Sequence, residues 1–149
     1  MAVQIGNENT NVTFIHNEDS IVRDCTIAQD AQRTEDLLQY TVMAYNATNQ
    51  NWVPFTVLND TEGESMPRGI YLGEDIDADD LVAGDIEDVS ILVKNGIVNR
   101  DMVVWDQDLQ TAESVVNPAT VNATSAEMAL IETANITMED VEAISDYEL

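Results

Sequence analysis

Residues 40–106 constrain the fold most, because short apolar runs alternate there with turn-forming residues. A first apolar run leads into the polar, turn-rich residues 46–51, and a return run follows at residues 52–55. Pro54 lies in that return run, and because proline cannot donate a backbone hydrogen bond to a sheet, it indicates a strand end or edge. The pattern is typical of a compact, mainly β domain.

The later part of this stretch predicts further strands. Gly69 and Gly73 flank an apolar strand, so backbones can approach closely or bend at both of its ends. Residues 89–93 predict a mostly buried strand, and residues 102–105 predict a final one. Between these two, residues 95–96 are Asn-Gly, the pair that a type I′ turn prefers, so we expect a hairpin there.

The chain divides into an N-terminal segment at residues 1–36, a β domain at residues 37–110 and an acidic C-terminal helical segment at residues 111–149. The N-terminal segment is mostly polar and lacks the apolar residues that it would need to fold alone. It predicts either an extra strand laid on the domain or an extended arm that orders on contact with a partner. In the second case, Val12, Phe14 and Ile15 are the residues that we expect to contact the partner's sheet.

Two helix-start patterns occur in the C-terminal segment. Thr124 and Glu127 have the spacing of a capping box, in which each side chain satisfies a free backbone N–H group. Asn135 suits a left-handed stop at the end of this helix. The apolar residues between them fall at helical spacing: Met128, Leu130, Ile131 and Ala134. Thr137 and Asp140 repeat the box, so we expect a second short helix.

The charge of the chain excludes several classes of partner. Its 29 acidic and 5 basic residues give a net charge of −24, which repels nucleic acid and anionic membrane surfaces. We expect no membrane span, since no run of about 18 apolar residues occurs. The N-terminus has no secretory pattern, so we expect synthesis in the host cytoplasm.

The scarcity of lysine is a second feature of the charge. Lys94 is the one lysine among the five basic residues. An acid-rich, lysine-poor chain is typical of proteins from a high-salt cytoplasm, where a Debye length of about 3 Å screens self-repulsion. An acidic protein of an ordinary host is the alternative.

Few residues could carry chemistry. An EF-hand loop that began at Asp75 would need glycine and glutamate at its sixth and twelfth positions, where Asp80 and Ile86 stand. We therefore expect residues 75–80 to be a solvated loop, with another kind of cation site as the alternative. Cys25 is the sole cysteine and His16 the sole histidine, so we expect a buried structural thiol rather than a nucleophile. Zinc-ligand spacing and a phosphate-binding Gly-rich loop are also missing, and we expect neither enzyme activity nor a cofactor.

The two tryptophans are candidates for packing and for contacts with a partner. Trp52 and Trp105 each lie within an apolar strand. Aromatic residues in such positions are more often core anchors or interface hot spots than platforms for a ligand.

The order and spacing of these parts resemble the lambda-type head decoration proteins of tailed viruses, also called capsid cement proteins. The resemblance covers roughly residues 37–106. Its matching pieces are NWVP at residues 51–54, RGIYL at residues 68–72, the apolar strand at residues 89–93, the turn at residues 95–96 and VVW at residues 103–105. A short helix at residues 127–136 fits the same pattern.

This resemblance implies an α+β fold that is mainly β, with a compact β-barrel or β-tulip-like domain, an extended N-terminal arm and short C-terminal helices. It implies a structural virion protein that binds the outside of the expanded capsid as a homotrimer. There it would bridge subunits of the major capsid protein, and its arm would complete a sheet on that partner. The long N-terminal segment and the acidic C-terminal segment depart from the family. Two other functions stay open: another virion component, such as a turret, fibre-base or tail protein, and a cellular acidic β-domain binding module.

Overall fold

The computed structural model describes residues 14–55, 66–106 and 123–139. Along the chain its elements are β1 (Phe14–Ile27), β2 (Val42–Asn46), β3 (Asn51–Pro54), β4 (Pro67–Tyr71), α2 (Ala78–Ala83), β5 (Ile86–Asn99), the 3-10 helix η2 (Arg100–Met102), α3 (Ala123–Ala134) and β6 (Ile136–Glu139). The expected mainly β fold with a small helical part is confirmed.

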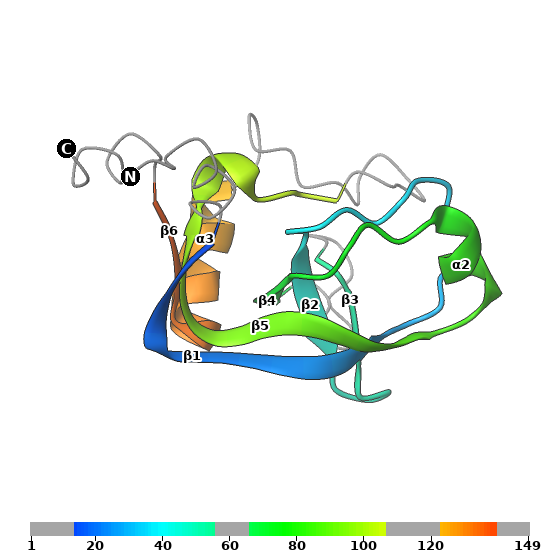
Figure 1. The fold of residues 1–149 in the computed structure, drawn as a ribbon, viewed down its shortest axis with the longest axis horizontal. Coiled ribbons are helices and arrows are strands. Elements are labelled where there is room, and N and C mark those ends of the chain that lie inside the picture. Colours follow the sequence, from blue (N-terminus) through cyan, green and yellow to red (C-terminus); the bar gives the residue numbers. More distant parts are fainter. Residues whose placement is uncertain (1–13, 56–65, 107–122, 140–149) are drawn as a thin grey trace, which may run out of the picture.

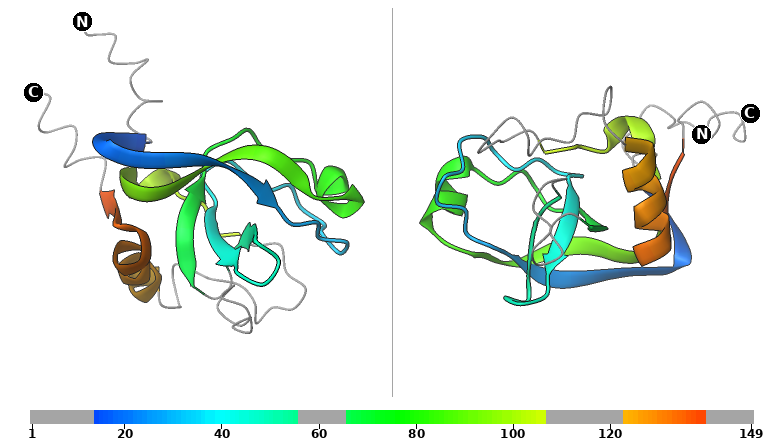
Figure 2. Two further views of the ribbon diagram at one scale, coloured as in Figure 1. Left: turned by 90° about the horizontal axis from the view of Figure 1, so that it is seen from below. Right: turned by 180° about the vertical axis from the view of Figure 1, so that it is seen from behind.

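Five of the strands close a small barrel. Strands β1, β3, β2, β4 and β5 lie side by side in this order, and β5 pairs in turn with β1. The long strands β1 and β5 run together along the bottom of Figure 1, and β2, β3 and β4 cross them, as Figure 2 also shows. Strand β6 pairs in parallel with the far end of β5, outside the ring. The expected barrel architecture is therefore present.

Strands β2, β4 and the middle of β5 bury side chains on both faces, and they separate two apolar clusters. One cluster contains α3 and β6, and the other contains Leu81 of α2 at the opposite end of the molecule (Figure 1). Neighbours in sequence enter different clusters: Ile70 and Tyr71 in β4, and Ile91 and Leu92 in β5. This explains why these strands read as continuous apolar runs instead of alternating apolar and polar residues.

Two local predictions are confirmed in the middle of the barrel. Strands β2 and β3 form the expected antiparallel hairpin, and Pro54 is the last residue of β3. Gly69 lies where backbones approach closely, since a Cβ atom there would be 2.8 Å from the Leu92 carbonyl oxygen. The glycine is therefore required by packing of β4 on β5.

The hairpin expected at residues 95–96 is wrong. Strand β5 continues through Asn95, which has a φ of 60°, and into the residues that pair with β1 and β6. The Ser20 hydroxyl donates to the Asn95 carbonyl oxygen, and Asn95 Nδ2 donates to the Asp19 carbonyl oxygen at 3.1 Å. Asn95, with its left-handed backbone, therefore lies at a bulge between the two long strands β1 and β5. Its hydrogen bonds to Asp19 and Ser20 of β1 take the place of those that a hairpin turn would form.

The N-terminal segment is not an extended arm over the whole of residues 1–36, because β1 lies within it and belongs to the barrel. Phe14 and Ile15 begin β1, where they pair with Val98 and Ile97 of this chain's own β5. Ile27, at the other end of β1, is fully buried in the second cluster. The alternative of an extra strand on the domain therefore applies to residues 14–27, because the barrel needs this strand to close. Val12 lies outside the described residues.

The C-terminal helix is confirmed, whereas residues 137–139, where we expected a second helix to begin, belong to a strand. The rest of that expected helix lies outside the described residues. Helix α3 ends at Ala134, and Asn135 follows with the expected left-handed φ of 54°. Residues from Ile136 then form β6, and both Ile136 and Met138 are buried in the first cluster. Burial of alternate apolar side chains along β5 outweighs the local capping signal that begins at Thr137.

Two smaller predictions also need correction. On α3 the buried stripe is Ala126, Leu130 and Ala134, whereas Met128 and Ile131 are exposed. The final strand expected at residues 102–105 is reduced to η2 and a single parallel bridge between Thr41 and Val104.

Candidate functional site

Two of the five basic residues are held by carboxylates within the domain. Arg33 forms a bidentate ion pair with Asp106, with both nitrogen–oxygen distances at 2.7 Å, and its side chain is 2% exposed. Arg100 pairs with Glu127 of α3 at 2.9 Å, in a more exposed position. These two arginines therefore serve the fold.

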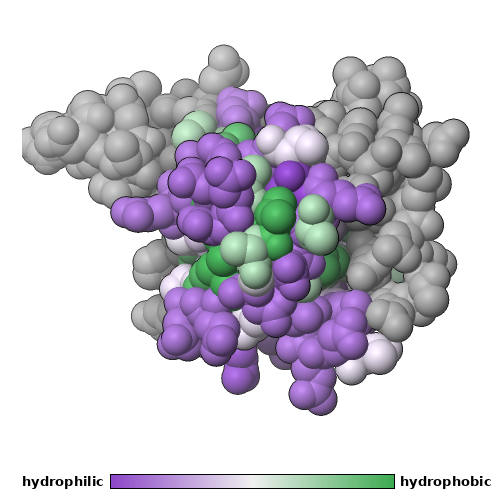
Figure 3. Space-filling model, turned by 90° about the vertical axis from the view of Figure 1, so that its right-hand side faces the viewer, coloured by the Kyte–Doolittle hydropathy of each residue, from purple (hydrophilic) through white to green (hydrophobic). Residues whose placement is uncertain are grey.

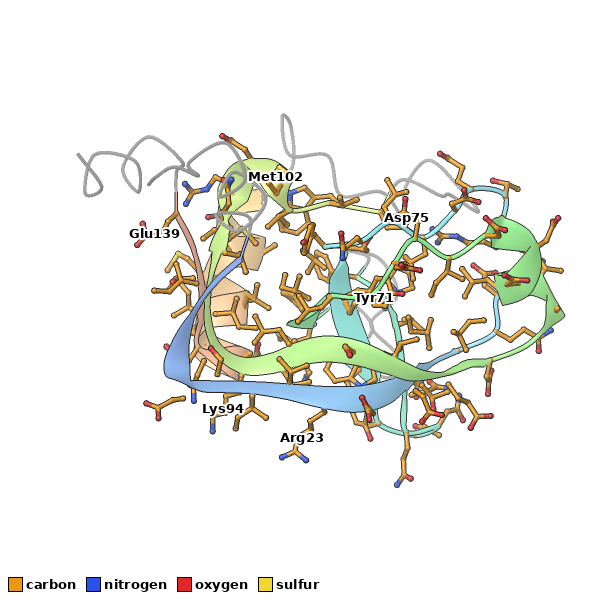
Figure 4. The ribbon with its side chains drawn as sticks, in the orientation of Figure 1. Arg23, Tyr71, Asp75, Lys94, Met102 and Glu139 are labelled. Atoms are coloured by element: carbon orange, nitrogen blue, oxygen red, sulfur yellow. The ribbon has the colours of Figure 1, made fainter. Side chains whose placement is uncertain are left out.

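Two of the other three basic residues converge on one groove. Arg23 and Arg68 are exposed and both line an open groove of about 310 Å³. The remaining lining residues are Cys25, Tyr45, Trp52, Val93 and Thr133. We call this set of residues the arginine groove. Lys94 is exposed on the same side of the molecule as Arg23, as Figure 4 shows, but it does not line the groove.

The backbone explains how the two arginines reach the same place. Strands β1 and β3 meet at a single register pair, Ile27 with Trp52, so the rest of β1 leaves room beside the β2–β3 hairpin. Arg68 is the extra residue at a bulge between β4 and β2, where a side chain can be re-aimed. Figure 2 shows the hairpin and α3 standing apart along β1 and β5.

Aromatic and aliphatic side chains form the floor of the arginine groove. Trp52 belongs to the second core cluster and is 9% exposed, and its ring centroid lies 5.3 Å from that of Tyr45. The absence of a side chain at Gly69 makes room for the indole, since a Cβ atom there would be 3.1 Å from Trp52 Cζ3. Trp52 is thus a core residue that also lines the arginine groove.

Trp105 lies elsewhere. It is half-buried against the first cluster, and its ring centroid is 6.2 Å from that of Phe55. The two tryptophans are therefore parts of different clusters rather than one aromatic platform.

Cys25 contributes apolar surface rather than a nucleophile. Its side chain is half-buried, whereas we expected a buried thiol. Burial raises the pKa of the Cys25 thiol above its ordinary value of 9.0; Arg23 opposes the shift and Asp24 adds to it. A thiol with a raised pKa is protonated at neutral pH, and the protonated form is a poor nucleophile.

The acidic run at residues 75–80 has structural roles. Asp75 accepts a hydrogen bond from the Gln39 backbone N–H at 2.8 Å, and the run continues into α2. Figure 4 shows Asp75 near the upper surface, away from Arg23. Within the described residues, no cluster of three or more histidine, cysteine, aspartate or glutamate side chains could hold a metal ion.

The remaining surface features are less distinctive. Figure 3 shows the α2 end of the molecule, where hydrophilic residues surround a small hydrophobic area. Among the helices that the structure describes, none has the length and apolar character to cross a membrane. No protein-family model and no curated protein matches this chain.

The sequence predictions missed the arginine groove. Its lining residues come from six different elements between Arg23 of β1 and Thr133 of α3, so no local pattern announces it. The available signal was the scarcity of basic residues. In a chain of net charge −24, each cation marks a place where an acidic group is attracted.

Proposed function

We propose that this protein is a capsid decoration protein, which binds the outside of an expanded viral head as a homotrimer and bridges major capsid protein subunits. The order of strands and turns in residues 37–106 resembles that family. The mainly β barrel fits this proposal, and so does a surface suited to binding protein rather than nucleic acid.

The outer edge of β1 is the observation that carries the proposal. Within the described residues, β1 pairs with β5 along one side, whereas its one strand pair on the other side joins Ile27 to Trp52 of β3. An open strand edge presents unpaired N–H and C=O groups to which another chain can add a strand. A long edge of this kind supports attachment to a sheet of a neighbouring protein.

The proposed effect on the capsid is energetic. A protein that binds the expanded shell and not its precursor stabilises the expanded state by linkage. At a hundredfold excess over Kd, each occupied site contributes about 2.7 kcal/mol. Summed over many sites, this resists the internal pressure of the packaged genome.

Co-sedimentation with expanded, undecorated capsids in molar salt tests the proposal. Saturable binding near one copy per major capsid subunit is expected. A protein that stays in the supernatant at every concentration would refute the decoration role. A variant that lacks residues 2–13, and with them Val12, tests the remaining arm hypothesis: we expect it to fold, because β1 is retained, and to bind capsids more weakly.

The alternative functions give different results in the same series. A turret, fibre-base or tail protein would label one vertex or the tail when imaged on particles. A cellular binding module would bind no part of the virion. The arginine groove alone is compatible with such a module, whereas saturable coverage of the head is not.

A further inference from the structure

We propose that the arginine groove binds an extended acidic peptide segment, whose carboxylates pair with Arg23 and Arg68 while an apolar side chain covers Trp52. This inference goes beyond the decoration role, because it names the chemistry of the ligand whatever protein carries the segment. Its test needs no capsid.

The two guanidinium groups supply the charge complementarity. Within the described part of the chain, neither Arg23 nor Arg68 makes an ion pair, unlike Arg33 and Arg100. Each guanidinium presents a planar fork of donors that fits a carboxylate in a bidentate manner. The chain carries a net charge of −24, and Asp24 acts on the Cys25 thiol within the groove, so the two guanidinium groups are what would attract an anionic side chain to this surface.

The floor of the groove requires more than a small anion. A single carboxylate or phosphate on the arginines would leave Trp52, Tyr45 and Val93 uncovered. The volume of about 310 Å³ lies at the small end of the range for ligand sites. It accommodates one apolar side chain between two flanking carboxylates, which is the composition of a short peptide motif.

The edge of β1 supplies the direction of the peptide. Arg23 and Cys25 belong both to the groove and to the part of β1 whose outer side has no strand among the described residues. A peptide added to that edge would turn its residues i, i+2 and i+4 toward the same face. The geometry therefore points to a motif with acidic, apolar and acidic residues at alternate positions.

A nucleic acid fits these observations less well. A single strand could stack a base on Trp52, but it carries a phosphate at every nucleotide. Those phosphates would extend past the two arginines onto a chain of net charge −24. A peptide needs only the two carboxylates that the groove can hold.

Fluorescence anisotropy of a labelled peptide tests the proposal with the full chain. The probe is Glu-Thr-Leu-Thr-Glu with neutral flanks, and the matched control peptide replaces both glutamates by glutamine. Measurements use the lowest salt concentration at which circular dichroism shows the folded state. We expect Arg23→Gln and Arg68→Gln each to raise Kd about tenfold, which corresponds to the loss of one charge-assisted hydrogen bond. Lys94→Gln removes the same charge outside the groove and should change Kd by less than about threefold.

Four results would overturn the proposal: no binding of the acidic peptide to the folded wild type, equal binding of the glutamine peptide, full binding by the double variant Arg23→Gln/Arg68→Gln, or tighter binding of an oligothymidine than of the acidic peptide. Hydrogen exchange gives an independent readout, because strand addition should protect β1 amides near Arg23. Peptide binding without capsid binding would support this inference and reject the decoration role. Capsid binding without peptide binding would support the decoration role and reject this inference.

Discussion

Replacing Asp106 by asparagine would leave the Arg33 guanidinium buried beside a neutral amide. The pair joins the segment before Leu37 to the residue that follows Trp105, and the Arg33 and Asp106 side chains are 2% and 13% exposed. Arg33 also donates to the carbonyl oxygens of Glu35 and Asp36, at 2.7 and 3.2 Å. These bonds would persist in the variant, but they do not neutralise the charge.

The expected loss of stability follows from that burial. Removing one partner of a buried ion pair costs about 3–5 kcal/mol, because the other charge stays desolvated. The retained carbonyl contacts of Arg33 and the partial exposure of Asp106 place Asp106→Asn at the low end, about 3 kcal/mol. For a chain near 150 residues, this lowers Tm by about 6–12 °C.

Urea unfolding followed by circular dichroism measures this loss in low and in molar salt. Glu127→Gln is the matched control, because it breaks the exposed pair with Arg100, which is worth at most about 1 kcal/mol and is screened by salt. The Asp106→Asn loss should persist in molar salt, since buried pairs are screened much less. A loss no larger than that of Glu127→Gln, or one that vanishes in molar salt, would refute the reasoning.

Two further predictions concern packing and pH. Gly69→Ala places a Cβ atom 2.8 Å from the Leu92 carbonyl oxygen, and we expect it to lower the free energy of unfolding, measured with urea, by about 1–3 kcal/mol. Gly84→Ala is the control: its Cβ atom meets no atom within 4 Å, so this variant should lose little stability. Equal losses in the two variants would contradict this. Burial raises the pKa of the Cys25 thiol above 9.0 and that of the Tyr71 hydroxyl above 10.0, with Asp75 and Glu74 adding to the second shift. The folded chain then holds the Cys25 and Tyr71 protons more tightly than the unfolded chain does. The contribution of these two groups to the free energy of unfolding is therefore fully present below about pH 9. It is lost as the pH rises through the raised pKa values of the folded chain. The double variant Cys25→Ala/Tyr71→Phe should show a flatter pH dependence in this range, and an unchanged slope would argue against the shifts.

Local chemistry was sufficient to predict the elements that depend on near neighbours in sequence. The β2–β3 hairpin follows from its turn residues, and Pro54 marks the end of β3 because its nitrogen cannot donate. Asn135 ends α3 because a left-handed residue is needed there, and asparagine tolerates that conformation. In these cases the local preference and the tertiary structure agree.

The errors arose where a distant segment decides the outcome. Asn95 adopts the positive φ that its turn signal predicts, but β1 and β6 flank β5 at this point and keep the strand continuous. Thr137 begins a capping pattern, yet the burial of Ile136 and Met138 beside β5 makes the segment a strand. A propensity worth a fraction of a kcal/mol cannot compete with two buried side chains.

The arginine groove could not be predicted by inspection of any one segment. Arg68 reaches it because a bulge in β4 shifts the register against β2, and that shift depends on pairing across the barrel. Arg23 reaches it because β1 joins the barrel, which the polar composition of the N-terminal segment did not require. The sequence could show only that such cations are scarce.

A high-salt cytoplasm, which the acid-rich and lysine-poor composition led us to expect, would explain why four of the five basic residues are arginine. In concentrated salt the Debye length falls to about 3 Å, so a cation contributes only through direct contact. Arginine suits direct contact, because its fork binds a carboxylate in a bidentate manner and is less strongly hydrated than an ammonium group. Arg33 and Arg100 make such contacts within the fold. The arginine groove offers two more guanidinium groups over an apolar floor, which is the arrangement that an acidic partner would need in order to bind when long-range attraction is screened.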